Sequence, residues 1–386
     1  MHGLLTWRPL VYDATLVFVR RLTFMNRSRF HTEIWHSLSL VALISGTHMV
    51  ARGQANGPSS EGVQPDGSLR LGVRSIPLPQ TISRIAQEYL TTRGLQPGFA
   101  FPPATDVEAW KKLAEGVRAR TPSASNALQS ISATVESAVL GESRVFIGTA
   151  KTIPQNHRRR AILDFHGGGF IFGGGELVRL EAGKMAAEYE CVVYAVDYRM
   201  PPEHPFPAAL DDAVTIYRAM LKKFKPADII FVGESAGGNI ATAAALKIRD
   251  LKLALPAALI LNSPEVDLTE SGDSFKTNLG LDVLLKNSFM QANLVYAGGH
   301  DLQDPFVSPL FGDFNKGFPP VYIQSGTRDL MLSNSARFHS KLKSAGVDSI
   351  LYVGEAMPHT GFGGATPEDK LFQVEQVRFM NRFWGK

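Results

Sequence analysis

A serine flanked by glycines, between an apolar run and a helix-forming run, most constrains what this chain can fold into. Residues 233–238 read GESAGG, a match to G-x-S-x-G. The apolar residues 228–232 precede this motif, and the alanine-rich residues 239–246 follow it. Such a strand, sharp turn and helix present a serine hydroxyl at the carboxyl end of a sheet. The pattern therefore predicts Ser235 as a nucleophile in an α/β protein.

A second glycine motif lies upstream, directly after a strand-like apolar run. Residues 166–170 read HGGGF, and three consecutive glycines do not favour the interior of a helix or a strand. They do let backbone N–H groups come close to a ligand, as in an oxyanion hole. We expect Gly168, Gly169 and Ala236 to donate such N–H groups, with Gly167 shaping the turn.

With these two motifs the chain resembles the hormone-sensitive-lipase-like branch of the α/β-hydrolases, also called bacterial esterase family IV. The resemblance covers about residues 140–384 and includes a third run, residues 197–212. That run is nearly D-Y-R-x-A-P-E-H-x-F-P-A-A-x-D-D, with Pro201 in place of alanine. The resemblance implies an α/β-hydrolase fold: a mostly parallel central sheet with helices on both faces and a helical cap.

The same resemblance implies the chemistry. The expected function is that of a carboxylesterase, a serine hydrolase that acts on short- to medium-chain acyl esters of small molecules. Such an enzyme needs neither a cofactor nor a metal ion. Amidase or lactonase action with the same residues is one alternative, and a non-catalytic ligand-binding member of the fold is another.

A serine hydrolase also needs a histidine base and a carboxylate, in the chain order serine, acid, histidine. Asp329 follows the strand-like residues 321–326, and His359 follows the strand-like residues 349–353. Both therefore fall in loops at the carboxyl ends of strands. We expect Ser235 to attack, His359 to move the proton and Asp329 to orient His359.

At the acid the sequence departs from the family's usual pattern. The family usually shows D-P-L-x-D-E after this strand, but here Ser333 and Asn334 replace the two later acids. Asp329 is then the nearby candidate, and Glu355 is a weaker alternative acid. Glu234, beside the serine, is interpreted as a side chain that supports the turn.

The 386 residues are expected to form three regions. Residues 1–55 read as a leader, 56–140 as a linker with cap helices, and 141–386 as the catalytic domain. A cap insertion is expected at about 265–315. Apolar spacing predicts helices at about 81–90, 107–117, 124–131 and 282–297. Strands are predicted at about 144–149, 161–165, 191–196, 229–232, 258–262, 321–325 and 349–353.

The leader assignment rests on a secretory pattern. Four arginines between residues 20 and 29 precede the apolar run 38–46, and small residues at 53–55 offer a cleavage site. The apolar run is too short for a stable membrane span. We expect a secreted or periplasmic protein, with a cytoplasmic location as the alternative.

Composition excludes several other classes. Cys191 is the single cysteine, so the chain has no internal disulfide and no cysteine metal site. No P-loop, H-E-x-x-H or G-x-G-x-x-G motif occurs. Beyond residue 55 the basic and acidic residues number 34 each, so no nucleic-acid partner is expected. The sequence is compatible with a homodimer as well as with a monomer.

Overall fold

The computed structural model describes residues 61–73 and 75–385, so the expected leader lies outside the described residues. The chain divides into two compact units between Ile76 and Pro77. In the first unit, β1 (Gly62–Val63) pairs antiparallel with β2 (Leu69–Arg70). The second unit contains every residue that the sequence predicts for the site.

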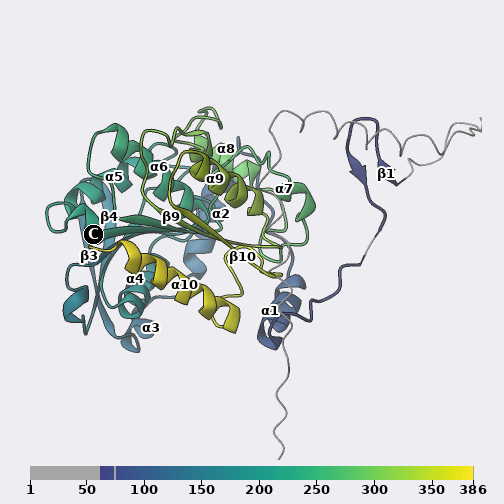
Figure 1. The fold of residues 1–386 in the computed structure, drawn as a ribbon. Helices are drawn as coiled ribbons and strands as arrows, with labels where there is room; N and C mark the ends of the chain where they lie inside the picture. Colours follow the sequence, from purple (N-terminus) through teal and green to yellow (C-terminus); the bar gives the residue numbers. More distant parts are fainter. Residues whose placement is uncertain (1–60, 74, 386) are drawn as a thin grey trace, which may run out of the picture. The chain divides into compact units, whose positions relative to one another are not determined.

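The second unit is built on an eight-stranded sheet with the order β10-β9-β8-β7-β5-β6-β4-β3 (Figure 1). All neighbouring strands are parallel except β4, which is antiparallel to both β3 and β6. The strands are β3 (Ala133–Leu140), β4 (Ser143–Ala150), β5 (Ala161–Phe165), β6 (Val192–Asp197), β7 (Ile229–Glu234), β8 (Ala258–Asn262), β9 (Val321–Gly326) and β10 (Ser349–Gly354). The predicted α/β-hydrolase architecture is confirmed.

Seven of these strands lie where the sequence predicts them, and β3 is the one that the pattern missed. β3 is an edge strand in which most side chains remain at least partly exposed, and it carries Glu136. An edge strand with exposed side chains does not need the continuous apolar run of the central strands, and the sequence of β3 has none. Pairing with β4 along its whole length is what makes it a strand.

Ten α-helices are present among the described residues. They are α1 (Arg84–Gly94), α2 (Val107–Arg120), α3 (Ser125–Gln129), α4 (Glu176–Tyr189), α5 (Ala208–Met220), α6 (Ala236–Asp250), α7 (Ser274–Thr277), α8 (Met290–Ala297), α9 (Leu332–Ser344) and α10 (Pro367–Phe383). Short 3₁₀ turns lie at Gln155–His157, Pro226–Asp228 and Pro309–Phe311. In residues 61–73 and 75–385, no helix combines the length and apolar character needed to cross a membrane.

Both faces of the sheet are covered, as predicted. Helices α5, α6 and α9 lie on one side, and α4 and α10 lie on the other (Figure 1). Successive strand residues point to opposite faces, so Leu163 and Phe231 join the first core while Ile162 and Ile230 join the second. Burial on both faces explains why most positions of the central strands are apolar, although β5 carries the buried Asp164.

The helix predicted at 282–297 is wrong in its first half, because only Met290–Ala297 is helical. The carboxylate of Asp282 accepts hydrogen bonds from the N–H groups of Leu284 and Leu285, and a local turn replaces the helix. Short polar side chains compete with helical hydrogen bonding in this way. The same side chain reappears in the site described below.

The core beneath the predicted nucleophile gives a stability prediction. Phe231 is fully buried on β7, and its ring centroid lies 5.7 Å from that of Phe165 and 5.1 Å from that of Tyr217. We expect Phe231→Ala to lower the free energy of unfolding by about 3–5 kcal/mol, since it leaves a cavity. Denaturant unfolding checks this. Val139→Ala, at an exposed position on β3, should cost below ~0.5 kcal/mol.

Candidate active site

Ser235 occupies the turn between β7 and α6 in a strained conformation. Its φ of 53° and ψ of −119° fall where residues with side chains are rare. The turn is held from the next strand: Ser235 N–H donates to Asn262 O at 2.9 Å, and Ser235 O accepts from Glu265 N–H at 3.1 Å. Strain of this kind persists only where surrounding contacts impose it, and it is typical of functional sites.

The glycine after the serine is required by close packing. A Cβ atom on Gly237 would lie 1.9 Å from the carbonyl oxygen of Phe165, at the end of β5. Helix α6 therefore begins in direct backbone contact with the neighbouring strand. The G-x-S-x-G spacing describes this contact, which places the serine at the helix N-terminus.

The glycine loop after β5 lies against this turn. A Cβ atom on Gly167 would stand 3.6 Å from the Cβ of Ser235. Gly168 has a φ of 115°, and a side chain there would lie 2.3 Å from the carbonyl oxygen of Phe172. The sequence-predicted loop and nucleophile are therefore neighbours.

The expected donor groups remain available in this arrangement. In the part of the chain that the structure describes, the N–H groups of Gly168, Gly169 and Ala236 have no acceptor. His166 acts as a support: its ring stacks on Tyr198 with centroids 4.0 Å apart, and its Nδ1–H donates to Gly167 O at 2.7 Å. The loop is thus held rigidly while its amides face no protein acceptor.

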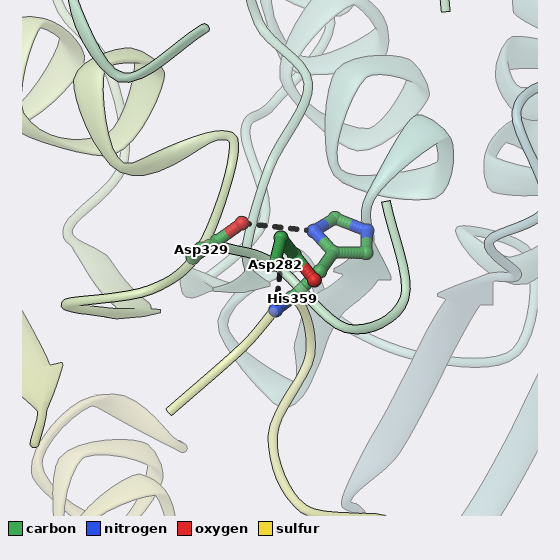
Figure 2. Close-up of side chains that lie close together, drawn as sticks. All are labelled: Asp282, Asp329 and His359. Atoms are coloured by element: carbon green, nitrogen blue, oxygen red, sulfur yellow. Dashed lines mark hydrogen bonds and ion pairs between the residues drawn. The ribbon is translucent and has the colours of Figure 1, made fainter. Parts of the chain in front are cut away.

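Asp329 and His359 meet at the same edge of the sheet. They follow β9 and β10, which pair in parallel register up to Gly326 and Gly354. His359 Nδ1–H donates to Asp329 Oδ1 at 3.1 Å (Figure 2). Asp329 is fully buried, and its Oδ2 accepts from Ser325 Oγ at 2.6 Å.

The end of β8 stands between the serine and the histidine. Ser263 follows Asn262, whose carbonyl holds Ser235, and its Oγ accepts the N–H of Thr360 at 3.0 Å. No hydrogen bond joins the Ser235 hydroxyl to His359 among the described residues. Such bonds are often long in unliganded sites and tighten when substrate binds.

The histidine and its acid shift each other's pKa. Burial by itself lowers the pKa of His359, but the hydrogen bond to Asp329 and the negative charges of Asp329, Asp282 and Glu234 raise it above 6.5. Burial by itself raises the pKa of Asp329, but its interaction with His359 and hydrogen bonds from serines hold that pKa below its usual value. Asp329 is therefore ionised throughout the pH range in which His359 gains or loses its proton.

Asp282 is a residue of this site that the sequence analysis missed. Its carboxylate is fully buried and accepts the N–H of Leu330 at 2.9 Å. It also accepts the N–H of His359 at 3.2 Å (Figure 2). Burial, with the nearby charge of Asp329, raises its pKa. A sequence signal was available, because an aspartate side chain often accepts the backbone N–H two residues on and so favours a turn. The apolar spacing instead predicts a helix that begins at this residue.

The cluster of Asp282, Asp329 and His359 brings possible metal-ligand atoms within 4.8 Å of one another. The oxygens already accept N–H and O–H hydrogen bonds, and Nδ1 of His359 donates its proton to Asp329. A metal ion would require these donors to be displaced. The donor set therefore fits a proton-handling network better than a metal centre.

The two other acids that the sequence raised form no hydrogen bond with Asp282, Asp329 or His359 in the described part of the chain, although the charge of Glu234 acts on His359. Glu355 is exposed and has no recorded bond to His359. Glu234 keeps an exposed side chain, although desolvation by surrounding protein raises its pKa to about 7.

Comparison with known proteins agrees with this geometry. Residues 162–362, just over half of the chain, match the family model described as alpha/beta hydrolase fold. An esterase of Acinetobacter venetianus is 38% identical over 223 residues, which cover 56% of this chain and 73% of that protein.

Solved structures show the same relationship. Esterase E25 superimposes with a TM-score of 0.72 at 32% identity, covering 82% of this chain and 99% of that one. An esterase from the bacterial hormone-sensitive lipase family superimposes with a TM-score of 0.64 at 28% identity, covering 78% and 97%. The chain belongs to the α/β-hydrolase family, in its hormone-sensitive-lipase-like esterase branch. It is a carboxylic ester hydrolase.

The raised pKa of His359 gives a pH prediction. A general base must be neutral, so kcat/KM should fall as the pH drops through the pKa of this imidazole. On the acidic side of the pH profile, which we call the acid limb, kcat/KM reaches half of its maximum at the midpoint. Because the pKa of His359 lies above 6.5, this midpoint should also lie above 6.5. Hydrolysis of p-nitrophenyl butyrate across the acidic and neutral range measures it. A midpoint at or below 6.5 would contradict the assigned environment of His359.

Proposed function

We propose that this esterase works through an acyl-enzyme intermediate formed on Ser235. The Oγ atom attacks the ester carbonyl carbon while His359 Nε2 takes the hydroxyl proton. The C–O bond to the alcohol then breaks, and His359 returns the proton to the departing alcohol. Water attacks the acyl-enzyme by the same route, which releases the acid and restores Ser235.

The observation that carries this proposal is the buried hydrogen bond between Asp329 and His359, at the strand ends beside the strained Ser235. With Nδ1–H held by Asp329, the lone pair lies on Nε2, where a base needs it. The charge of Asp329 also stabilises the imidazolium formed during attack.

The negative oxygen of the tetrahedral intermediate needs its own donors. We assign this role to the N–H groups of Gly168, Gly169 and Ala236, which have no acceptor within the described chain. Ala236 also begins helix α6, and the N-terminus of a helix favours negative charge. Each such donor is worth about 3 kcal/mol of barrier.

The nucleophile is tested by Ser235→Ala. We expect this variant to keep the fold and to lose both ester hydrolysis and labelling by a fluorophosphonate probe. Mass spectrometry of the labelled wild-type protein locates the modified residue. Labelling that persists in the variant would place the nucleophile elsewhere.

The acid is tested by Asp329→Asn. This change removes the charge and favours the wrong imidazole tautomer, so kcat should fall by a factor on the order of 10⁴. Circular dichroism should show an unchanged fold. Glu355→Gln is the matched control and should cost little, because Glu355 is exposed. The reverse pattern of losses would mean that the acid is misassigned.

The proposed preference for short to medium acyl chains rests on an aromatic cluster over the glycine loop. The cluster contains Phe99, Phe101, Trp110, Phe172 and Phe289. The ring centroids of Phe101 and Phe289 lie 4.9 Å apart, and a Cβ on Gly169 would stand 3.1 Å from the Phe289 ring. Side chains from helix α2, from the loop before it and from the insertion thus pack on the proposed oxyanion loop and the residues that follow it.

We therefore expect p-nitrophenyl butyrate to be hydrolysed faster than the laurate or palmitate ester. Phe289→Ala should shift the preference toward longer chains, because it opens this cluster. Leu279→Ala, at an exposed position of the same insertion, is the control and should leave the profile unchanged. A wild-type preference for long-chain esters would overturn this assignment.

A further inference from the structure

The proposed catalytic triad consists of Ser235, Asp329 and His359. The buried carboxylate of Asp282 lies outside this triad and is hydrogen bonded to the loops that carry Asp329 and His359. Oδ2 of Asp282 accepts the N–H of Leu330, the residue after Asp329, and the N–H of His359 itself. One oxygen atom thus bridges the loops after β9 and β10. Backbone N–H groups buried in this way need an acceptor, and Asp282 supplies it for both loops.

The other oxygen fixes where this carboxylate stands. Oδ1 accepts the N–H groups of Leu284 at 2.9 Å and Leu285 at 3.1 Å, which closes a turn in the insertion between β8 and β9. Four N–H donors therefore converge on one carboxylate. All four are backbone groups, so their positions follow the three chain segments and not flexible side chains.

The side chain of Asn278, in the same insertion, also forms hydrogen bonds with the loop that carries Asp329. Asn278 Nδ2 donates to Asp329 O at 2.8 Å and to Thr327 O at 3.2 Å. The carbonyl of Asn278 accepts the N–H of Asp282 at 3.0 Å. The insertion is thus hydrogen bonded to the backbone of Asp329 on both sides.

Apolar contacts complete the connection. Phe275 and Leu285 from the insertion form a buried cluster with Leu330 and Met331, which directly follow Asp329. The insertion that carries Phe289 over the glycine loop is therefore packed against the acid loop as well.

We propose that Asp282 is a positioning residue, which aligns Asp329 with His359. Because Asp282 lies in the insertion between β8 and β9, this alignment depends on the position of that insertion. This inference rests on the proposed triad and extends it. In such a triad one acid orients the imidazole ring. Here a second acid orients the backbone from which both the ring and the first acid project.

The charge of Asp282 affects the pKa of His359, so the pH dependence of activity tests this proposal. A purely structural role for Asp282 would leave that pH dependence unchanged. Around His359 stand Asp329, Asp282 and Glu234, and Glu265 lies near on the loop after β8. Asp282 faces four backbone donors and acts only as an acceptor, and this geometry favours its ionised form against the burial that raises its pKa. Its negative charge favours the imidazolium and contributes to the raised pKa of His359.

The test compares Asp282→Asn, Asp282→Glu and Asp329→Asn in the full-length protein. Asp282→Asn keeps the shape of the side chain but removes its charge. The amide NH2 of the asparagine then points at backbone N–H donors, from which it cannot accept a hydrogen bond. We expect kcat to fall by a factor on the order of 10², the cost of a small misplacement of catalytic groups. KM should change little, and the midpoint of the acid limb should move to lower pH.

Asp282→Glu separates geometry from charge. It should lower kcat, because the longer side chain misplaces the bridging oxygen, but it should keep the acid limb close to that of the wild type. Asp273→Asn removes an exposed acid from the same insertion and is the matched control, with kcat and pH profile unchanged. The rate of fluorophosphonate labelling should follow kcat in each variant.

The outcomes distinguish this inference from the proposed function. Wild-type kcat and pH profile in Asp282→Asn, with Asp329→Asn severely impaired, would overturn the positioning role and leave the triad intact. A loss on the order of 10⁴ in Asp282→Asn with a mild Asp329→Asn would make Asp282 the acid itself, and both proposals would fail. Should Asp282→Asn fail to fold, unchanged kcat in Asp282→Glu would overturn the positioning role.

Discussion

The contact between the start of α6 and the end of β5 is the constraint on which the rest of the site depends. Gly237 stands so close to the carbonyl of Phe165 that no side chain fits between them. This contact forces the turn at Ser235 into its positive φ and brings the glycine loop after β5 alongside. Nucleophile and proposed oxyanion donors are thus placed by one backbone contact.

The proton-handling side of the site depends on buried charge. A carboxylate taken out of water without partners costs several kcal/mol. Hydrogen bonds from surrounding N–H or O–H donors offset part of this cost for Asp329 and Asp282. Burial then strengthens their interaction with His359, since the local dielectric constant is low. The cost of folding these acids inward is offset by hydrogen bonds that also fix their geometry.

The insertion between β8 and β9 contacts both the aromatic cluster and the network around His359. It contributes Phe289 to the aromatic cluster over the glycine loop and Asp282 to the network around His359. Under the two proposals above, a substrate that contacts the cluster would act on the same segment that positions His359. This arrangement gives a physical route by which the fit of the acyl chain affects turnover as well as binding.

What the sequence by itself determined was local. Ser235, the glycine loop, seven strands and the loops of Asp329 and His359 were all predictable, because each depends on a short motif or on the apolar pattern of one strand. Tertiary structure alone decided the edge strand β3, the shortened helix α8 and the place of Asp282. β3 exists because β4 pairs with it, and Asp282 acquires its role from N–H groups that lie 48 and 77 positions away in the chain. Hydrogen bonds between such distant segments leave no periodicity in a sequence, so only the folded chain reveals them.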